Sequence, residues 1–265
     1  MNYDSLESEI KGKHIIAKPE GIFFSLDPIR SPDSRSKCPS GWTIKSFLGK
    51  GTFGKVFTTC CEKKCGYVVK ISELRTDWMR SSARKEFCIW KSIQGLGLSP
   101  KLIDAHIEKN YSMFIMEVMT GDIMYLMEKY PSKELLELII NKVGNILSTL
   151  HKNEIIHGDT HYGNFMYKVA DDKIPKNVIK AIESGKIKIK VIDFGQSTTF
   201  ELEIQEGTDA ERAIKFKLKY DFYRFMETLM EFSPKGIRDI LNDNKDIVKR
   251  YSDKYGIDMD SILLY

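Results

Sequence analysis

The stretches HGDTHYGN, residues 157–164, and VIDFG, residues 191–195, decide the fold of this chain. They carry two carboxylates and one amide, at Asp159, Asp193 and Asn164. In this pattern Asp159 accepts the proton of an attacking hydroxyl, while Asn164 and Asp193 supply the hard oxygen ligands that Mg²⁺ prefers. The two stretches together predict a site that holds a phosphoryl group and its magnesium ions.

A glycine-rich segment lies upstream, where Gly49, Gly51 and Gly54 form G-x-G-x-x-G and Val56 follows. Glycines allow the backbone to approach phosphates closely, because a side chain there would collide. The commonest rival, a dinucleotide site, requires a helix directly after the glycines. Residues 55–59 are mostly β-branched or aromatic, so the segment favours a β-hairpin.

The next predicted strand, residues 66–71, contains Lys70 among apolar residues. An isolated lysine of this kind is usually an edge-strand residue, but its position after the glycine loop favours contact with phosphates. A helix is predicted over residues 81–94, and its Glu86 is the candidate partner that orients Lys70. The alternative is a solvated glutamate, since basic residues precede it directly.

In this order the elements resemble the protein kinase superfamily, with its glycine loop, V-A-I-K strand, H-R-D-x-x-x-x-N loop and D-F-G motif. The resemblance runs from Trp42 to about Phe232. It implies an α+β, bilobal fold, with a small antiparallel β-sheet N-lobe and a mostly helical, trimmed C-lobe. The implied divisions are an N-terminal extension, 1–40, an N-lobe, 41–118, and a C-lobe, 119–265.

The resemblance implies that the chain binds ATP with Mg²⁺, or with Mn²⁺ as a substitute metal. It implies catalytic roles for Asp159, Lys70, Glu86 and His161, and metal ligation by Asn164 and Asp193. The residues implied to contact the nucleotide are Leu48, Gly49, Lys50, Gly51, Thr52, Phe53, Gly54, Val56, Val68, Lys70, Met116, Glu117, Met119, Asp122 and Met166.

The chain departs from the family pattern in the catalytic loop and after it. Gly158 replaces the usual arginine, and no A-P-E motif follows Gly195. His161 stands where Ser/Thr kinases have a lysine that steadies the γ-phosphate; it either donates a hydrogen bond there or is a partly exposed loop residue. Asp221 is expected to cap backbone amides of the catalytic loop from a central helix.

The resemblance favours a serine/threonine protein kinase with a protein substrate. The string H-G-D-x-H-x-x-N is also similar to aminoglycoside and choline phosphotransferases and to atypical and large-DNA-virus protein kinases. A small-molecule phosphotransferase is therefore one alternative, although such enzymes carry larger C-lobe insertions. A pseudokinase scaffold that binds nucleotide is the other alternative.

Composition excludes some classes of function. The 265 residues carry a net charge of +4, with both signs interspersed, so no basic stripe predicts nucleic-acid binding. No apolar run is long enough to span a membrane, and the N-terminus lacks a signal-peptide pattern. We therefore expect a soluble, intracellular protein, cytoplasmic in its host cell or carried in a virion if the source is viral.

Five cysteines include a cluster at Cys60, Cys61 and Cys65. A zinc site with Cys38 has an unusual spacing, and disulfides are not expected in an intracellular chain of this length, so we expect reduced thiols beside a β-turn. Residues 171–186 form a polar, lysine-rich insertion, for which a solvated surface excursion is expected.

Overall fold

The structure is a computed structural model that describes residues 15–18, 21–24, 38, 41–51, 54–170, 173–206 and 209–257. The chain divides into two compact units. We call them the first unit, Met1–Phe87 with Lys101–Val118, and the second unit, Cys88–Pro100 with Met119–Tyr265. Residues 88–100, which fall within the predicted N-lobe, belong to the second unit. The predicted lobe boundaries stay a prediction. No helix within the described ranges is long and apolar enough to cross a membrane.

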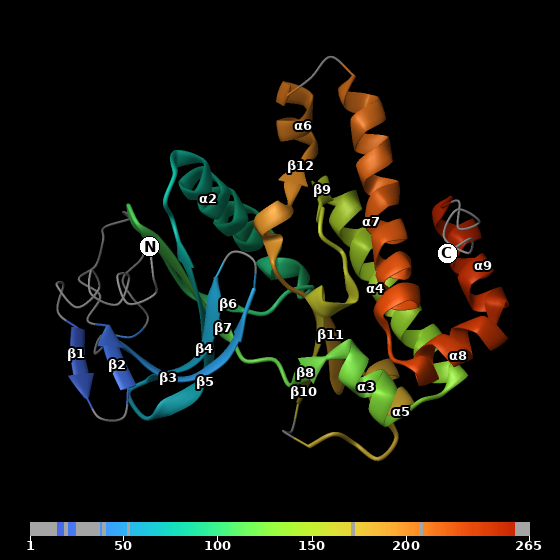
Figure 1. Cartoon of the computed structure of the whole chain (residues 1–265), viewed down its shortest axis with the longest axis horizontal. Helices are drawn as coiled ribbons and strands as arrows, with labels where there is room; N and C mark the ends of the chain where they lie inside the picture. The colour runs from blue at the N-terminus through green and yellow to red at the C-terminus, as the bar shows by residue number, and fades with distance from the viewer. Residues whose placement is uncertain are drawn as a thin grey trace. The chain divides into compact units, whose positions relative to one another are not determined.

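A seven-stranded sheet dominates the first unit (Figure 1). Its strand order is β1-β2-β3-β4-β5-β7-β6, and each neighbouring pair is antiparallel. The strands are β1 (Ile15–Lys18), β2 (Gly21–Phe24), β3 (Trp42–Lys50), β4 (Lys55–Cys61), β5 (Lys64–Glu73), β6 (Leu102–Ile107) and β7 (Tyr111–Glu117). Alternate side chains of a strand point to one face. One face buries a cluster that includes Trp42, Phe57, Val69, Ile71, Met113 and Ile115. The predicted antiparallel β-sheet is confirmed.

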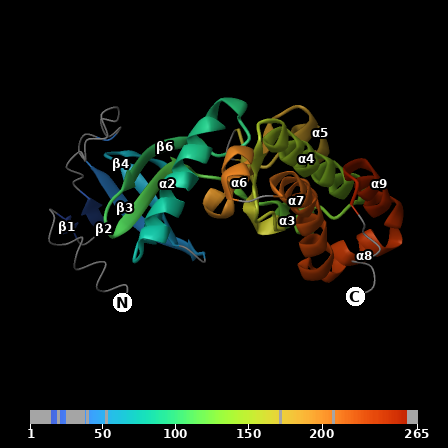
Figure 2. The same cartoon turned by 90° about the horizontal axis from the view of Figure 1, so that it is seen from above.

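Helix α2, Asp77–Ser92, lies beside the strands of this sheet (Figure 2). It begins before the predicted start at Ser81, because the Thr76 hydroxyl accepts a hydrogen bond from the Met79 N–H at 3.2 Å. Asp77 also places negative charge in the first turn, where the helix dipole favours it. The helix carries Glu86 at a buried position on its inner side.

The cysteine cluster forms two disulfides, so the expectation of reduced thiols was wrong. Cys60 pairs with Cys65 across the β4–β5 hairpin, and Cys61 pairs with Cys38, which precedes β3. Adjacent residues of a strand point to opposite faces, so Cys60 and Cys61 reach different partners. The antiparallel hairpin brings Cys65 back to Cys60, a proximity that the spacing of cysteines alone does not reveal.

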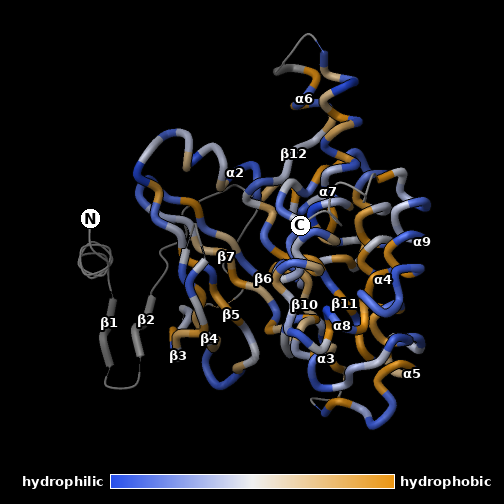
Figure 3. Tube along the Cα trace, turned by 45° about the vertical axis from the view of Figure 1, so that its right-hand side comes forward, coloured by the Kyte–Doolittle hydropathy of each residue, from blue (hydrophilic) through white to orange (hydrophobic). Residues whose placement is uncertain are grey.

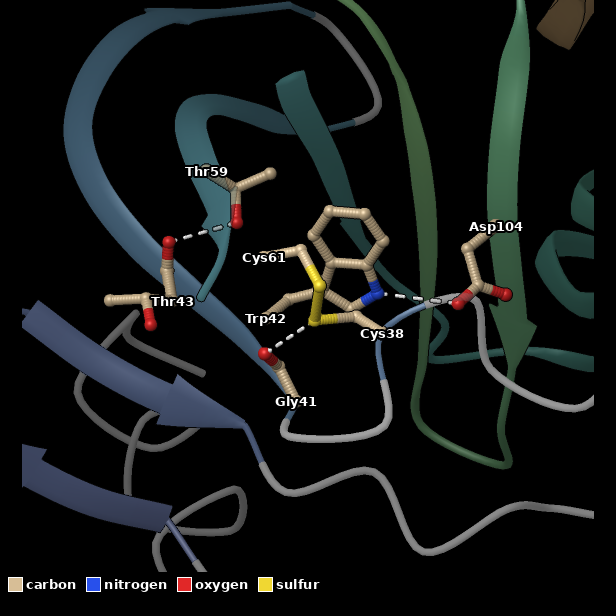
Figure 4. Close-up of a disulfide and its surroundings, with 7 residues drawn as sticks. All are labelled: Cys38, Gly41, Trp42, Thr43, Thr59, Cys61 and Asp104. Carbon is tan, nitrogen blue, oxygen red and sulfur yellow. Dashed lines mark hydrogen bonds between the residues drawn. A yellow bond between two sulfur atoms is a disulfide. The ribbon is translucent and has the colours of Figure 1, made fainter. Parts of the chain in front are cut away.

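Figure 4 shows the surroundings of the Cys38–Cys61 disulfide. The Trp42 indole Nε1 donates to Asp104 Oδ2 at 3.2 Å, and Thr59 Oγ1 donates to the Thr43 carbonyl oxygen at 2.9 Å. Cys38 Sγ lies 2.9 Å from the Gly41 carbonyl oxygen. A disulfide sulfur has no proton to donate, so this contact is a hydrogen bond only when Cys38 is reduced.

The second unit is mostly helical, as predicted. The boundary between the units falls within α2, whose last residues belong to the second unit. The other helices of the second unit are α3 (Ile123–Lys129), α4 (Lys133–Lys152), α5 (Val178–Glu183), α6 (Phe200–Glu206), α7 (Ala210–Phe232), α8 (Lys235–Asp243) and α9 (Lys245–Tyr255). Helix α4 begins where the Ser132 hydroxyl accepts from the Leu135 N–H at 3.1 Å. Its buried face repeats at three- and four-residue spacing, through Leu136, Ile139, Ile140, Val143 and Leu147.

Short strands hold the two motif loops in place. They are β8 (Gly121–Asp122), β9 (Ile155–Ile156), β10 (Phe165–Val169), β11 (Ile187–Val191) and β12 (Thr198–Thr199). Strand β10 pairs with β11 and with β8, and β9 pairs with β12. The HGDTHYGN loop lies between β9 and β10, and Asp193 follows β11, so these pairings bring the two loops side by side.

Of the predicted insertion at residues 171–186, the described part, residues 173–186, packs more closely than expected. Asn177 caps the short helix α5, and Val178, Ala181 and Ile182 are buried by it. Helix α5 packs against α4 and β11. Its apolar residues recur at three- and four-residue spacing, which is typical of a buried helix face. The lysine-rich composition of the segment suggested a solvated excursion instead.

Candidate active site

Lys70 and Glu86 form the predicted ion pair in the first unit. Lys70 Nζ lies 2.9 Å from Glu86 Oε1, and the two residues are only 9% and 5% exposed. Strand β5 positions the lysine between Val69 and Ile71, and helix α2 positions the glutamate. A charge buried this deeply requires its partner, so each side chain fixes the other. The contact of Lys70 with nucleotide phosphates stays a prediction.

The three glycines of the loop between β3 and β4 differ in their surroundings. A Cβ added at Gly54 would lie 2.5 Å from the Ile71 carbonyl oxygen, so the protein itself requires glycine there. A Cβ at Gly49 or Gly51 would meet no described atom within 4 Å. The packing of the described residues therefore does not itself require glycine at these two positions. Leu48 is 55% exposed beside them, and the contacts of all three residues with nucleotide stay predictions.

The remaining first-unit residues predicted to contact nucleotide follow the sheet. Val56 and Lys70 are register partners on β4 and β5, Val68 faces Met116 on β7, and Lys50 faces Lys55. Thr52 and Phe53 lie outside the described residues. Their contacts with nucleotide stay predictions.

Glu117, predicted to lie in the adenine-binding segment, has a structural role at the end of β7. Its N–H donates to the Lys101 carbonyl oxygen at 3.0 Å, and its Oε1 accepts from the Lys101 N–H at 3.0 Å. The Val118 N–H donates to the Gly66 carbonyl oxygen at 3.2 Å. Adenine recognition by Met116, Glu117 and Met119 stays a prediction.

Asp122 and Met166 lie together in the second unit as register partners of β8 and β10. Asp122 Oδ1 accepts from the Tyr125 N–H at 2.8 Å and so caps helix α3, a role that the sequence reading did not include. Tyr167 follows Met166. Burial, and then the charges of Tyr125 and Asp122, raise the pKa of its phenol to about 12. Ribose binding by Asp122 stays a prediction.

The HGDTHYGN loop is closed by Asn164. The Asn164 amide Nδ2 donates to the Asp159 carbonyl oxygen at 2.7 Å, and the Asp159 N–H donates to His157 Nδ1 at 3.3 Å. Because the amide nitrogen is used in this way, Asn164 presents Oδ1 as its remaining polar atom. The Asp159 carboxylate keeps 36% of its surface exposed, as a proton acceptor requires.

Asp221, on helix α7, anchors the same loop through its carboxylate. Its carboxylate accepts from the His157 N–H at 2.9 Å and from the Gly158 N–H at 2.8 Å, and it lies 2.9 Å from His151 Nε2. The predicted capping role is thereby confirmed. Thr160 Oγ1 adds a bond to the Asp221 carbonyl oxygen at 2.6 Å.

The glycine at position 158 has a structural reason. Gly158 has φ +80°, and a Cβ there would lie 2.7 Å from the Gln196 carbonyl oxygen. Both the left-handed backbone and the close approach disfavour any side chain. The arginine that the family usually carries here does not fit this loop.

His161 lies beside Asp159 and is partly exposed. Its Nδ1 accepts from the Gly163 N–H at 3.2 Å, and its Nε2 lies 3.8 Å from Asp159 Oδ2. When Nδ1 accepts, the proton of neutral imidazole is on Nε2 and faces the carboxylate. A distance of 3.8 Å is too long for a hydrogen bond, so the contact is electrostatic. A catalytic role for His161 stays a prediction.

Asp193 has an unusual backbone conformation. Its φ of +62° is left-handed, which is uncommon for a residue other than glycine and tends to occur at functional sites. The next residue, Phe194, is fully buried, with ring centroids 5.3 Å from His157 and 6.1 Å from Trp90. His157 Nε2 donates to the Ile192 carbonyl oxygen at 3.0 Å, so this histidine supports the second motif.

Asn164 and Asp193 carry the oxygen atoms that suit the predicted divalent metal, and metal ligation by them stays a prediction. The Ile192 N–H donates to the Asn164 carbonyl oxygen at 2.9 Å, which joins the two loops. Mg²⁺ commonly takes only one or two protein ligands and completes its shell with water and phosphate oxygens. Among the described residues, no group of three or more His, Cys, Asp or Glu could hold a metal unaided.

Arg224, on α7, experiences the charge of Asp159, a relation that the sequence did not predict. It bonds Glu227 Oε2 through Nη1 at 2.6 Å. The hydrogen bond to Glu227 raises the pKa of this guanidinium, and the charge of Asp159 adds to the effect. Arg224 lies one turn from Asp221 on the helix that anchors the loop, and this position in the sequence could have indicated that it lies near the site.

Comparison with known proteins gives the family. Residues 42–216, more than half of the chain, match the family described as protein kinase domain. The chain therefore belongs to the protein kinase superfamily and has its bilobal α+β fold.

Three relatives that the chain matches are protein kinases, and their sequence identities to the chain are similar. An Aurora kinase of Schizosaccharomyces pombe is 27% identical over 57% of this chain and 39% of its own length. Calcium-dependent protein kinase 4 of Plasmodium falciparum is 26% identical over 58% of this chain and 28% of its own length. A calcium/calmodulin-dependent protein kinase type 1 of Caenorhabditis briggsae is 24% identical over 66% and 47%. The matched part thus spans less than half the length of each relative.

Proposed function

We propose that this chain is an ATP-dependent serine/threonine protein kinase. It would transfer the γ-phosphoryl group of ATP, bound with Mg²⁺ or Mn²⁺, to a hydroxyl of a protein substrate. Membership of the protein kinase superfamily supports phosphotransfer, and the relatives it matches are protein kinases.

The observation that carries the proposal is the state of the HGDTHYGN loop. Asn164 and His157 hold the backbone of Asp159 while its carboxylate remains exposed, and Asp221 anchors the loop through two amides. A scaffold without catalysis has no need of an exposed carboxylate held in this way. The buried Lys70–Glu86 pair supports the same conclusion for the first unit.

In the proposed reaction, Asp159 accepts the proton of the substrate hydroxyl. The hydroxyl oxygen forms a bond to the γ-phosphorus as the bond to ADP breaks. Asn164 Oδ1 and the Asp193 carboxylate would hold the divalent ion, which neutralises phosphate charge when it is bound. Lys70, held by Glu86, would neutralise charge on the phosphates that stay with ADP. Catalysis then depends mainly on alignment and on charge neutralisation.

The experiment is transfer of label from γ-labelled ATP by wild type, Asp159→Asn and Asp193→Ala. Asp239→Asn, an exposed carboxylate on α8, is the matched control. Acceptors are the chain itself, basic and acidic proteins, and a panel of hydroxyl- and amino-bearing small molecules. We expect label on serine or threonine of protein, abolished by both site variants and retained by Asp239→Asn.

Other outcomes would overturn the proposal in distinct ways. Label on small molecules alone would make the chain a small-molecule phosphotransferase. ATP binding with no transfer to any acceptor would make it a pseudokinase. Label on tyrosine alone would contradict the serine/threonine assignment.

A further inference from the structure

Three aromatic rings stack along the outside of helix α7, at Phe216, Tyr220 and Tyr223. Their centroids lie 6.0 Å and 6.1 Å apart, with interplanar angles of 21° and 23°. Phe216 is 67% exposed and Tyr220 is 37% exposed. We call these three residues, with Lys219 between them, the aromatic strip. Tyr223 is partly buried, so the exposed part of the strip is centred on Phe216 and Tyr220. Exposed apolar side chains that lie together commonly mark an interaction site.

The aromatic strip is not covered by its neighbouring helix. Helix α6 packs against α7 on another side, where Lys217 Nζ bonds Glu203 Oε2 at 2.6 Å and Glu203 is buried. Figure 1 shows α6 and the first half of α7 as a helical pair that extends beyond the rest of the second unit. In Figure 3 this pair alternates hydrophobic and hydrophilic positions. Ile204, on α6, is also 61% exposed.

The strip continues directly from the candidate active site. Arg224 follows Tyr223 and is within the electrostatic reach of Asp159. The Tyr162 N–H donates to Thr228 Oγ1 at 3.2 Å, so the catalytic loop rests on the next turn of the same helix. From Tyr223 to Phe216 the helix rises about 10 Å, which an extended peptide covers with about three residues.

The charge of the strip selects among peptides. Lys219 lies one turn from both Phe216 and Tyr223, and in the described part of the chain it makes no ion pair. Arg212, a turn before Phe216, has only a 3.9 Å contact to an exposed Asp209. At the other end, Glu227 is bonded to Arg224, and Glu227 and Glu231 both act on Tyr223. The strip therefore offers rings with positive charge toward its Phe216 end, from Lys219 and Arg212, and with negative charge at its Tyr223 end.

We propose that the aromatic strip binds the part of a protein substrate that flanks the phosphorylated residue. It would select an aromatic or large apolar side chain that stacks on Phe216 or Tyr220, next to an acidic residue that pairs with Lys219. This inference rests on the proposed function, because the bound segment is that of a kinase substrate.

The first test measures binding without requiring transfer. A degenerate peptide library around a central serine is selected on the Asp159→Asn protein, and the same protein is tested with Phe216→Ala plus Tyr220→Ala added. We expect enrichment of an aromatic or apolar residue beside an acidic one, lost in the strip variant. Phe232→Ala, which removes a 61% exposed ring from the far end of α7, is the matched control and should keep the selection.

The second test measures specificity through transfer. For a selected peptide, Phe216→Ala plus Tyr220→Ala should lower kcat/KM about tenfold, while KM for ATP and transfer to a peptide without the flank stay unchanged. Lys219→Glu should change the preferred acidic residue to a basic one, a reversal that unfolding does not produce.

The outcomes separate this inference from the proposed function. Binding that depends on the strip, without transfer by wild type, would support the docking site and overturn only the kinase activity. Transfer with unchanged peptide preference in the strip variants would overturn the inference and leave the activity. A wild-type dimer that Phe216→Ala dissociates, with unchanged preference, would assign the strip to self-association and also overturn it.

Discussion

The two units hold their functional side chains in different ways. In the first unit, Lys70 is positioned by a buried ion pair with Glu86. In the second unit, the loop of Asp159 is held by several hydrogen bonds that converge on Asp221, with Asn164 and Thr160 adding others. An ion pair between two side chains therefore fixes the residue predicted to act on the nucleotide, whereas a carboxylate that accepts several hydrogen bonds anchors the loop predicted to act on the acceptor.

The largest effect is expected at that anchor. Asp221→Ala would leave two backbone amides and His151 without their buried acceptor, which should cost about 3–5 kcal/mol of unfolding free energy and abolish transfer. Urea unfolding with Asp239→Ala as control measures it. An unchanged unfolding midpoint would contradict the anchoring role.

Loss of the Glu86 charge in the first unit should cost less stability than loss of Asp221 but should be equally visible in catalysis. Glu86→Gln keeps an oxygen near Lys70 and removes the charge, so we expect about 2 kcal/mol of destabilisation. Transfer should fall at least tenfold, with weaker ATP binding. Glu62→Gln, an exposed change on the β4–β5 turn, is the control. Equal transfer by Glu86→Gln and wild type would remove the ion pair from the account.

The glycine loop allows a matched pair of substitutions within one motif. Gly54→Ala should destabilise the first unit by about 1–3 kcal/mol, because the new Cβ overlaps the Ile71 carbonyl oxygen. Gly51→Ala should leave unfolding unchanged and weaken only ATP binding. Thermal unfolding and nucleotide titration distinguish the two. Equal destabilisation by Gly54→Ala and Gly51→Ala would contradict the prediction that glycine at position 51 is needed only for ATP binding.

The smallest effect concerns the disulfides, which occur only in the first unit among the described residues. Reduction should lower hydrogen-exchange protection in β4 and β5 and leave α4 unchanged. Cys38→Ser removes the longer loop, of sequence separation 23, and Cys65→Ser the shorter, of separation 5. The first should cost about 1 kcal/mol more under oxidising conditions. Identical protection with and without reductant would contradict both bonds.

Much of this arrangement follows from local sequence patterns. The strands, helices α2 and α4, the Lys70–Glu86 pair and the capping by Asp221 each depend on periodicity or motif order, which the sequence displays directly. The disulfides do not, because the hairpin register, rather than the cysteine spacing, brings Cys65 to Cys60. The packing of helix α5 was not expected, because three buried residues are few beside the lysines of the surrounding segment.

Other features depend on contacts between distant residues. The glycine at 158 is required by the Gln196 carbonyl oxygen, which the β9–β12 pairing brings close. The charge of Asp159 acts on Arg224 because α7 also carries Asp221 and Thr228, which bind the loop of Asp159. The exposure of Phe216 could not be read from sequence, since the same spacing of aromatic residues is typical of a buried helix face.

We infer that Lys70 with Glu86 acts on the nucleotide and that Asp159 acts on the acceptor hydroxyl. Measuring ATP affinity and single-turnover transfer together, for wild type, Asp159→Asn and Glu86→Gln, tests this division of roles most directly. We predict that Asp159→Asn binds ATP as wild type does and transfers nothing, whereas Glu86→Gln loses both affinity and rate. Transfer by Asp159→Asn at the wild-type rate would contradict the account.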